Sequence, residues 1–194
     1  GKNCGSSITS RWIFHMLNRQ SITSLPNGLI SSPPDKLSLS CHPLPADKFM
    51  FCIQENPIDV MALRHQMTDP TCGALVVFEG LVRNHHEGRN VEKLHYTQHP
   101  ILAQKEGERI VAEAMRKFPM VKALAIHRIG TLKISECAVV TLTSSAHRDA
   151  AFDANRYLID SIKARVPIWK QETYATGEVE WTSPCPNCGP VPHS

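Results

Sequence analysis

The sequence predicts an α+β fold with mixed or antiparallel sheets. Two stretches, residues 100–118 and 144–166, repeat apolar side chains at the spacing of a helix. Runs of β-branched and apolar residues at 73–83 and 137–143 predict strands. Helical and strand patterns do not alternate regularly along the chain, as they would in a parallel α/β fold. The order therefore favours the α+β class.

The first ordered elements are expected near residue 49. The apolar run FMFCIQ at 49–54 has the character of a short strand. A helix should follow over 56–67, with Asn56 as its cap and Pro57 in its first turn. We expect the buried face of this helix to carry Ile58, Met61, Ala62 and His65.

A hairpin is expected next. The run GALVVFEGLVR at 73–83 reads as a long strand, and the alternating segment VEKLHYTQ at 91–98 as its return strand. The polar loop between them carries a glycine. This arrangement would place Arg83 at the mouth of the hairpin.

The stretch 100–118 should be a helix, and Pro100 suits its first turn. A strand is expected over 121–130, ending in a glycine turn. The apolar stripe of the helix is predicted to comprise Leu102, Glu106, Ile110, Val111 and Ala114.

The third strong strand, CAVVTLT at 137–143, is apolar enough to be buried on both faces. The helix that follows should end before Pro167, which removes a donor and disfavours helix in the preceding residue. IWKQET at 168–173 then alternates as a strand. One face of this strand should carry Ile168, Lys170 and Glu172.

Composition excludes several function classes. The chain is 42% hydrophobic and 20% charged, with a net charge of +3, and no apolar run reaches the roughly 18 residues that span a bilayer. The mild charge and the lack of an aromatic–basic surface pattern argue against nucleic-acid binding. The seven cysteines are odd in number and mostly scattered, which fits a reducing compartment, so we predict the cytosol.

Three segments are expected. Residues 1–46 form a disordered or leader segment, residues 47–182 a folded domain, and residues 183–194 a flexible C-terminal tail. The leader has no acidic residue from Gly1 to Pro34 and is rich in Ser and Pro. This composition fits an organelle transit peptide, a disordered leader or an upstream translation artefact.

The sequence SSAHR joins the third strand to the last helix. Free backbone N–H groups and the helix dipole at this point favour an anion. His147 and Arg148 are unfavourable to the dipole there, and a bound anion would explain them, although a plain surface pair explains them too.

Two lysines flank the chain break at Pro167. When ammonium groups are close together or partly desolvated, their pKa falls below about 10.4, which permits proton transfer near neutral pH. Lys163 and Lys170 are therefore candidate catalytic residues, and Glu172 either orients Lys170 or forms a plain surface ion pair. The predicted phosphate pocket comprises Arg83, His147, Arg148, Lys163 and Lys170.

Other candidate sites are weaker. Cys185 and Cys188 have half the spacing of a zinc site, and only His193 lies nearby. His85 and His86 fit a solvated loop better than a metal site. We therefore predict no metal and no cofactor.

Four motifs carry a resemblance to a known family. FEGLVR at 78–83, IHRIG at 126–130, SSAHRDAAFDA at 144–154 and KARVPIWKQE at 163–172 are similar to the large, catalytic subunit of molybdopterin synthase. The motifs occur in the family's order over roughly residues 48–181. The resemblance implies an α/β-hammerhead-type fold and a homodimer.

The resemblance also implies a reaction and partners. Each subunit would bind a small ubiquitin-like protein, giving a heterotetramer, and take sulfur from its C-terminal Gly-Gly thiocarboxylate. The acceptor would be cyclic pyranopterin monophosphate, which becomes the dithiolene of molybdopterin in molybdenum cofactor biosynthesis. Lys163 and Lys170 match the family's catalytic positions, and Arg83, His147 and Arg148 its substrate-binding positions. The family's C-terminal arginine has no identifiable equivalent here, and residues 94–103 are less acidic and aromatic than is usual.

Two rival functions are open. A scaffold could bind a ubiquitin-like tail without sulfur chemistry, although it would not need both lysines. A cysteine-based sulfurtransferase could use Cys185 or Cys188, and thiol alkylation would then abolish its activity.

Overall fold

The computed structural model describes residues 49–182, which belong to one compact unit of the chain. The expected leader, the Cys185–Cys188 pair and the tail at 183–194 lie outside these residues. None of the helices within 49–182 is long and apolar enough to cross a membrane.

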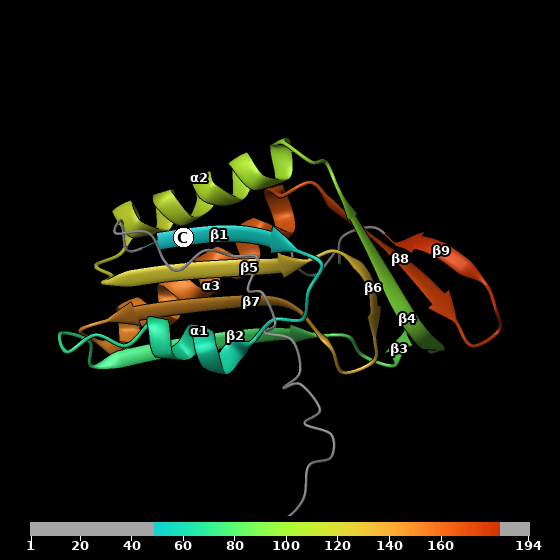
Figure 1. Cartoon of the computed structure of the whole chain (residues 1–194), viewed down its shortest axis with the longest axis horizontal. Helices are drawn as coiled ribbons and strands as arrows, with labels where there is room; N and C mark the ends of the chain where they lie inside the picture. Colours follow the sequence, from blue (N-terminus) through green and yellow to red (C-terminus); the bar gives the residue numbers. More distant parts are fainter. Residues whose placement is uncertain (1–48, 183–194) are drawn as a thin grey trace, which may run out of the picture. The chain divides into compact units, whose positions relative to one another are not determined.

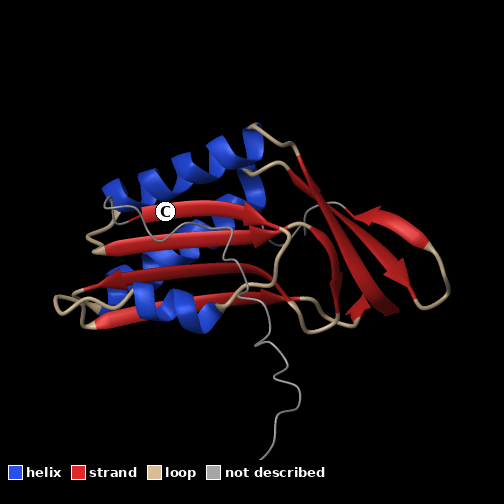
Figure 2. Ribbon diagram, viewed as in Figure 1, coloured by secondary structure: helices blue, strands red, loops and turns tan. Residues whose placement is uncertain are grey.

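The first sheet has four strands in the order β1-β5-β7-β2. These are β1 (Phe49–Gln54), β5 (Lys122–Arg128), β7 (Cys137–Ser145) and β2 (Ala74–Leu81). β1 and β5 are parallel, and the other neighbours are antiparallel. Figures 1 and 2 show the four strands side by side.

Helices cover both faces of this sheet. On one face, α2 (Leu102–Lys117) and α3 (Arg148–Arg165) form a core with β1 and β5. The other face is covered by α1 (Val60–Gln66) (Figure 1). Leu63 of α1 packs on side chains of β5 and β7. The expected burial of β7 on both faces is confirmed.

The second sheet contains β3 (His85–His86), β4 (Arg89–Gln98), β8 (Ile168–Tyr174) and β9 (Val179–Thr182) in that order. β6 (Gly130–Lys133) also pairs with β4. A small core beneath this sheet includes Leu94, Leu132 and Tyr174. The α+β class with mixed sheets is thus confirmed.

The predicted long hairpin is wrong. β2 pairs with β7 in the first sheet, whereas β4 pairs with β8 and β6 in the second. The loop contains only the short β3–β4 hairpin, which turns at Glu87 and Gly88, both with positive φ. Strand patterns do not specify which strands pair, and here the chain crosses from one sheet to the other between β2 and β4.

The cap and the buried face of α1 differ from expectation. The helix begins at Val60, and the Asp59 side chain accepts a hydrogen bond from the Ala62 backbone N–H at 2.9 Å. Met61 is 63% exposed, whereas Leu63 and Met67 are buried. The side of the helix that faces the sheet therefore carries Leu63, with Met67 one turn later.

The apolar stripe of α2 is confirmed at Ile110, Val111 and Ala114. It is wrong at Leu102, which is exposed, and at Glu106, which forms an ion pair with Arg165. Gly107 is a buried position of α2 that the prediction did not include. It faces the Phe51 ring so closely that a Cβ at this position would overlap the ring. The other buried position is Ala103.

Within residues 49–182, two cysteines are free thiols. These are Cys72 and Cys137. Burial raises the pKa of the Cys137 thiol to about 11, so this thiol stays protonated near neutral pH.

Candidate functional site

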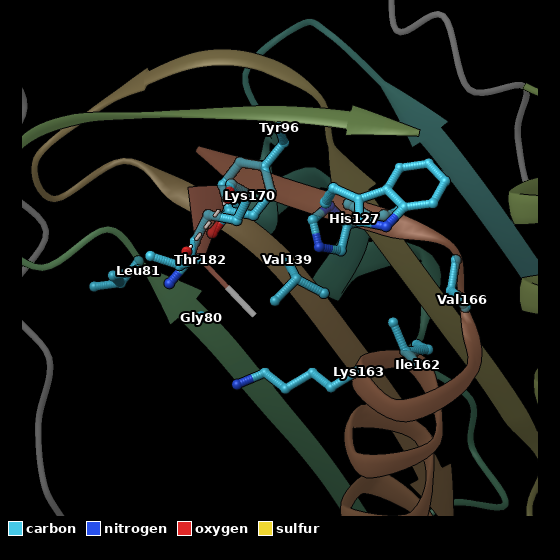
Figure 3. A pocket seen from close by; sticks show the side chains of 13 residues that line it. Gly80, Leu81, Tyr96, His127, Val139, Ile162, Lys163, Val166, Lys170 and Thr182 are labelled. Carbon is cyan, nitrogen blue, oxygen red and sulfur yellow. Dashed lines mark hydrogen bonds between the residues drawn. The ribbon is translucent and has the colours of Figure 1, made fainter. Parts of the chain in front are cut away.

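A pocket of about 200 Å³ lies where the two sheets meet (Figure 3). Its walls come from both sheets and from the last turn of α3. The side chains that line it include Leu81, Tyr96, His127, Val139, Lys163, Trp169 and Lys170.

The pocket brings together the two lysines on either side of the chain break. α3 ends at Arg165, and the Val166 N–H caps it by bonding the Ile162 carbonyl. Pro167 prevents the helix from continuing, and β8 begins directly after it. The reversal places Lys163 and Lys170 in the lining of the same cavity, as Figure 3 shows.

Lys170 is held by a buried carboxylate. Its Nζ lies 2.8 Å from Oε1 of Glu172, whose side chain is only 3% exposed. Tyr174 donates a hydrogen bond of 2.8 Å to Oε2 of the same carboxylate, and His86 Nδ1 lies 3.1 Å from Oε1. This arrangement is not a plain surface ion pair.

The charge of Glu172 follows from these contacts. Burial alone would raise the pKa of this carboxyl, but hydrogen bonds from Lys170 and Tyr174 and the charges of Lys170 and His86 outweigh burial. The net pKa is lowered, so Glu172 is ionised at neutral pH.

Two further pocket residues, Tyr96 on β4 and His127 on β5, form the inner wall of the pocket. Tyr96 is the direct partner of Lys170 across β4 and β8. Burial, with a smaller effect of Glu172, raises the pKa of Tyr96 to about 12, so its hydroxyl stays protonated. His127 packs edge-on against Tyr96, with ring centroids 5.2 Å apart.

Sequence reasoning missed Tyr96, His127 and Trp169 as pocket residues. His127 lies inside the IHRIG motif, which marked the segment but not the role of its side chain. The signal for Tyr96 was absent, because only the β4–β8 register places it beside Lys170.

The anion-binding candidates are dispersed in one chain. Arg83 is exposed in the loop after β2, two residues beyond the pocket residue Leu81. His147 caps α3 and Arg148 begins it, both exposed, and Arg148 lies 3.7 Å from Asp149.

Within one chain, the structure does not bring His147 and Arg148 to the lysines. Arg148 begins the 18-residue helix α3, whereas Lys163 lies in its last turn. At about 1.5 Å per residue, the two Cα atoms are on the order of 20 Å apart. The single pocket predicted for all five residues therefore does not form in one chain, and the binding roles of His147 and Arg148 stay predictions.

A buried polar cluster fixes α3, and hence Lys163, on the sheet. Asn155 is 4% exposed and donates to the backbone carbonyls of Val76 on β2 and Thr141 on β7, at 3.3 and 3.0 Å. Its Oδ1 accepts a hydrogen bond from the Thr141 hydroxyl at 3.0 Å. These bonds set the position of the helix along β7.

Comparisons with known proteins give a consistent result. The model of the MoaE protein family matches residues 53–165. A molybdopterin synthase catalytic subunit from Thermoplasma volcanium is 40% identical over 129 residues, which are 66% of this chain and 94% of that protein. The corresponding subunit from Bos taurus is 34% identical over 160 residues, or 81% and 84% of the two chains.

Solved structures agree with the sequence relatives. The X-ray structure of molybdopterin synthase from Staphylococcus aureus is similar with a TM-score of 0.63 and 38% identity, covering 68% of this chain and 95% of that one. The resemblance carried by the four motifs is thus confirmed: this chain belongs to the MoaE family, the catalytic subunits of molybdopterin synthase.

Proposed function

We propose that this chain transfers sulfur from the C-terminal thiocarboxylate of a small ubiquitin-like partner to cyclic pyranopterin monophosphate, at the pocket that contains Lys163 and Lys170. The observation that carries the proposal is the convergence of these two lysines on one cavity, with Lys170 paired to the buried Glu172. Two transfers would build the dithiolene of molybdopterin.

The lysines supply the charge and the proton transfer that this reaction needs. The thiocarboxylate sulfur would attack an oxygen-bearing side-chain carbon of the substrate. The C–S bond would form as the C–O bond of that carbon breaks, the oxygen would leave with a proton, and the product would be a thioester between partner and substrate. Water would then cleave the thioester, releasing the partner as a carboxylate and leaving sulfur on the substrate. Ammonium groups stabilise the oxyanion that develops at the acyl carbon, and they return protons to leaving oxygens.

The two lysines differ in their surroundings, which suggests different roles. Lys163 is exposed and has no ion pair with any residue in 49–182, so it is available to the glycine end of the partner. Lys170 is half-buried, with a side chain 28% exposed, and Glu172 holds it in one geometry. A fixed ammonium is suited to stabilising charge at the substrate.

The partner is proposed from the family. A solved structure from Helicobacter pylori, described as a complex of subunits 1 and 2 of molybdopterin-converting factor, shares the fold at 20% identity and a TM-score of 0.58. By analogy, a ubiquitin-like subunit would insert its Gly-Gly tail into the pocket beside Lys163.

The distance along α3 bears on the homodimer. About 20 Å separates His147 and Arg148 from Lys163 in one chain. If His147 and Arg148 bind the phosphate of the substrate molecule that contacts the lysines, they must therefore come from a second copy of the chain. Arg83 could act within the same chain as the lysines. Mixed dimers test this arrangement: His147→Ala and Lys163→Ala copies, inactive alone, should regain part of the activity when combined.

Reconstitution tests the proposed reaction. The protein would be mixed with a thiocarboxylated partner and cyclic pyranopterin monophosphate, and molybdopterin detected as its fluorescent oxidised derivative. Lys163→Ala and Lys170→Ala should abolish product, whereas Lys105→Ala, an exposed lysine of α2 outside the pocket, should not. Lys170→Arg should also lose activity, since the larger, planar guanidinium keeps the charge but cannot place it where the ammonium lies beside Glu172.

Partner binding separates the two function classes. If folded Lys163→Ala and Lys170→Ala both kept wild-type product formation, the mechanism would be wrong. If the wild type bound its partner but formed no product, the chain would be a scaffold rather than an enzyme.

A further inference from the structure

We infer that His127 is a specificity-determining residue of the pocket, whose Nε2 accepts a hydrogen bond from a ring N–H of the substrate heterocycle. This inference rests on the proposed substrate, a reduced pyranopterin, which carries ring N–H donors as well as a phosphate. It assigns the heterocycle to the inner wall formed by β4 and β5, apart from the two lysines.

The tautomer of His127 follows from its backbone contact. Nδ1 lies 2.7 Å from the carbonyl oxygen of Arg128. A carbonyl oxygen only accepts hydrogen bonds, so Nδ1 must carry the proton. In a neutral ring, Nε2 then holds a lone pair and is an acceptor.

The surroundings keep this ring neutral. Burial lowers the pKa of His127 to about 4, a hydrogen bond to the Arg128 carbonyl opposes this, and the charge of Lys163 lowers the pKa further. The charged or titratable side chains near the ring are Lys163 from α3 and Tyr96 from β4, whereas Arg128 contacts the ring only through its backbone carbonyl. None of these is an anion that would favour an imidazolium, so the acceptor persists across the physiological pH range.

Nε2 is free to meet a ligand. No hydrogen bond joins it to any residue in 49–182, although His127 lines the pocket. The lining residues Gly80, Val139 and Ile162 are apolar and have no side-chain donor for Nε2. An imidazole nitrogen held among them is a directional acceptor, which phosphate cannot use but a ring N–H can.

The flanking side chains suit a flat heterocycle. The Tyr96 ring is T-shaped to His127 at an interplanar angle of 71°, and Trp169 also lines the pocket. Aromatic walls favour planar ligands. The ammonium groups of Lys163 and Lys170 remain for the reacting and anionic parts of the substrate.

The first test is binding, measured apart from the reaction. Cyclic pyranopterin monophosphate would be titrated into the protein without partner, with tryptophan fluorescence as the readout, since Trp169 lines the pocket. His127→Leu removes the acceptor and leaves a ligand N–H unpaired, so Kd should rise about tenfold or more. His127→Gln places an amide oxygen near the Nε2 position and should recover most of the affinity. His65→Leu, an exposed histidine of α1, is the matched control and should bind normally.

The second test needs no variant, which covers the case in which His127→Leu does not fold. Nitrogen NMR of the wild type with labelled histidine should show a protonated Nδ1 and an unprotonated Nε2 from pH 5.5 to 8. Addition of cyclic pyranopterin monophosphate should shift Nε2. The inference is overturned if Nε2 is protonated, or if the chemical shift of Nε2 does not change at saturating ligand.

The outcomes separate this inference from the proposed function. Normal product formation with unchanged Kd and KM in folded His127→Leu would overturn the role of His127 and leave the sulfur transfer standing. Binding that weakens in His127→Leu, in a protein that makes no product, would support the role of His127 and refute the transfer.

Discussion

Replacing Glu172 by glutamine should remove the ion pair that holds Lys170, while the side chain at position 172 keeps its shape. The carboxylate is buried, accepts from Tyr174 at 2.8 Å and lies 2.8 Å from the Lys170 ammonium. The amide can still accept from Tyr174 but carries no charge to hold Lys170.

The expected loss of stability follows from these contacts. A hydrogen bond to a charged group contributes about 1.5–3 kcal/mol. Lys170 is 28% exposed, so water can partly replace the lost partner, and we expect about 2 kcal/mol at pH 7. Because a misplacement of about 1 Å can cost on the order of 100-fold in rate, kcat should fall between tenfold and 100-fold.

The pH dependence of this loss has a definite sign. The pKa of Glu172 is lower in the folded protein than its ordinary value of 4.5, so the unfolded chain binds the proton more readily. The stabilisation is complete above pH 4.5 and is lost as pH falls through the folded-state pKa. The stability difference between wild type and Glu172→Gln should therefore be largest near pH 7 and shrink below pH 4.5.

Urea unfolding monitored by tryptophan fluorescence, repeated between pH 3.5 and 7.5, measures this difference. Glu180→Gln is the matched control, since Glu180 faces Glu172 across β8 and β9 but forms an exposed ion pair with Arg89. The reasoning is refuted if Glu172→Gln is no less stable than Glu180→Gln at pH 7, or if its deficit persists unchanged in acid.

Two further changes test the framework behind the pocket. Gly107→Ala should destabilise the fold by about 1–3 kcal/mol, because the new methyl overlaps the Phe51 ring and pushes α2 from β1; a urea midpoint equal to wild type would contradict this contact. Asn155→Ala should cost a similar amount by leaving buried polar groups of β2 and β7 unpaired. It should also lower kcat by shifting the helix that carries Lys163, whereas a change in stability alone would show that the helix keeps its position.

Local chemistry determined much of this protein. The apolar and β-branched residues of CAVVTLT in β7 were enough to predict a strand buried on both faces. Pro167 was enough to predict the end of α3 and the start of β8, because proline lacks a donor and restricts its predecessor. These features depend on neighbours in the chain, which the sequence displays directly.

Tertiary structure decided which segments meet. A run of β-branched and apolar residues predicted β2, and alternation predicted β4. Their partners are β7 and β8, because strand pairing depends on how whole sheets pack. The same packing joined Tyr96 and His127 to Lys163 and Lys170, from four elements distant in sequence. His147 lies at the opposite end of α3 from Lys163, because the length of the helix lies between the two residues. The sequence by itself thus supplied the reactive side chains, and only the packing of two sheets against one helix end decided which of them share a pocket.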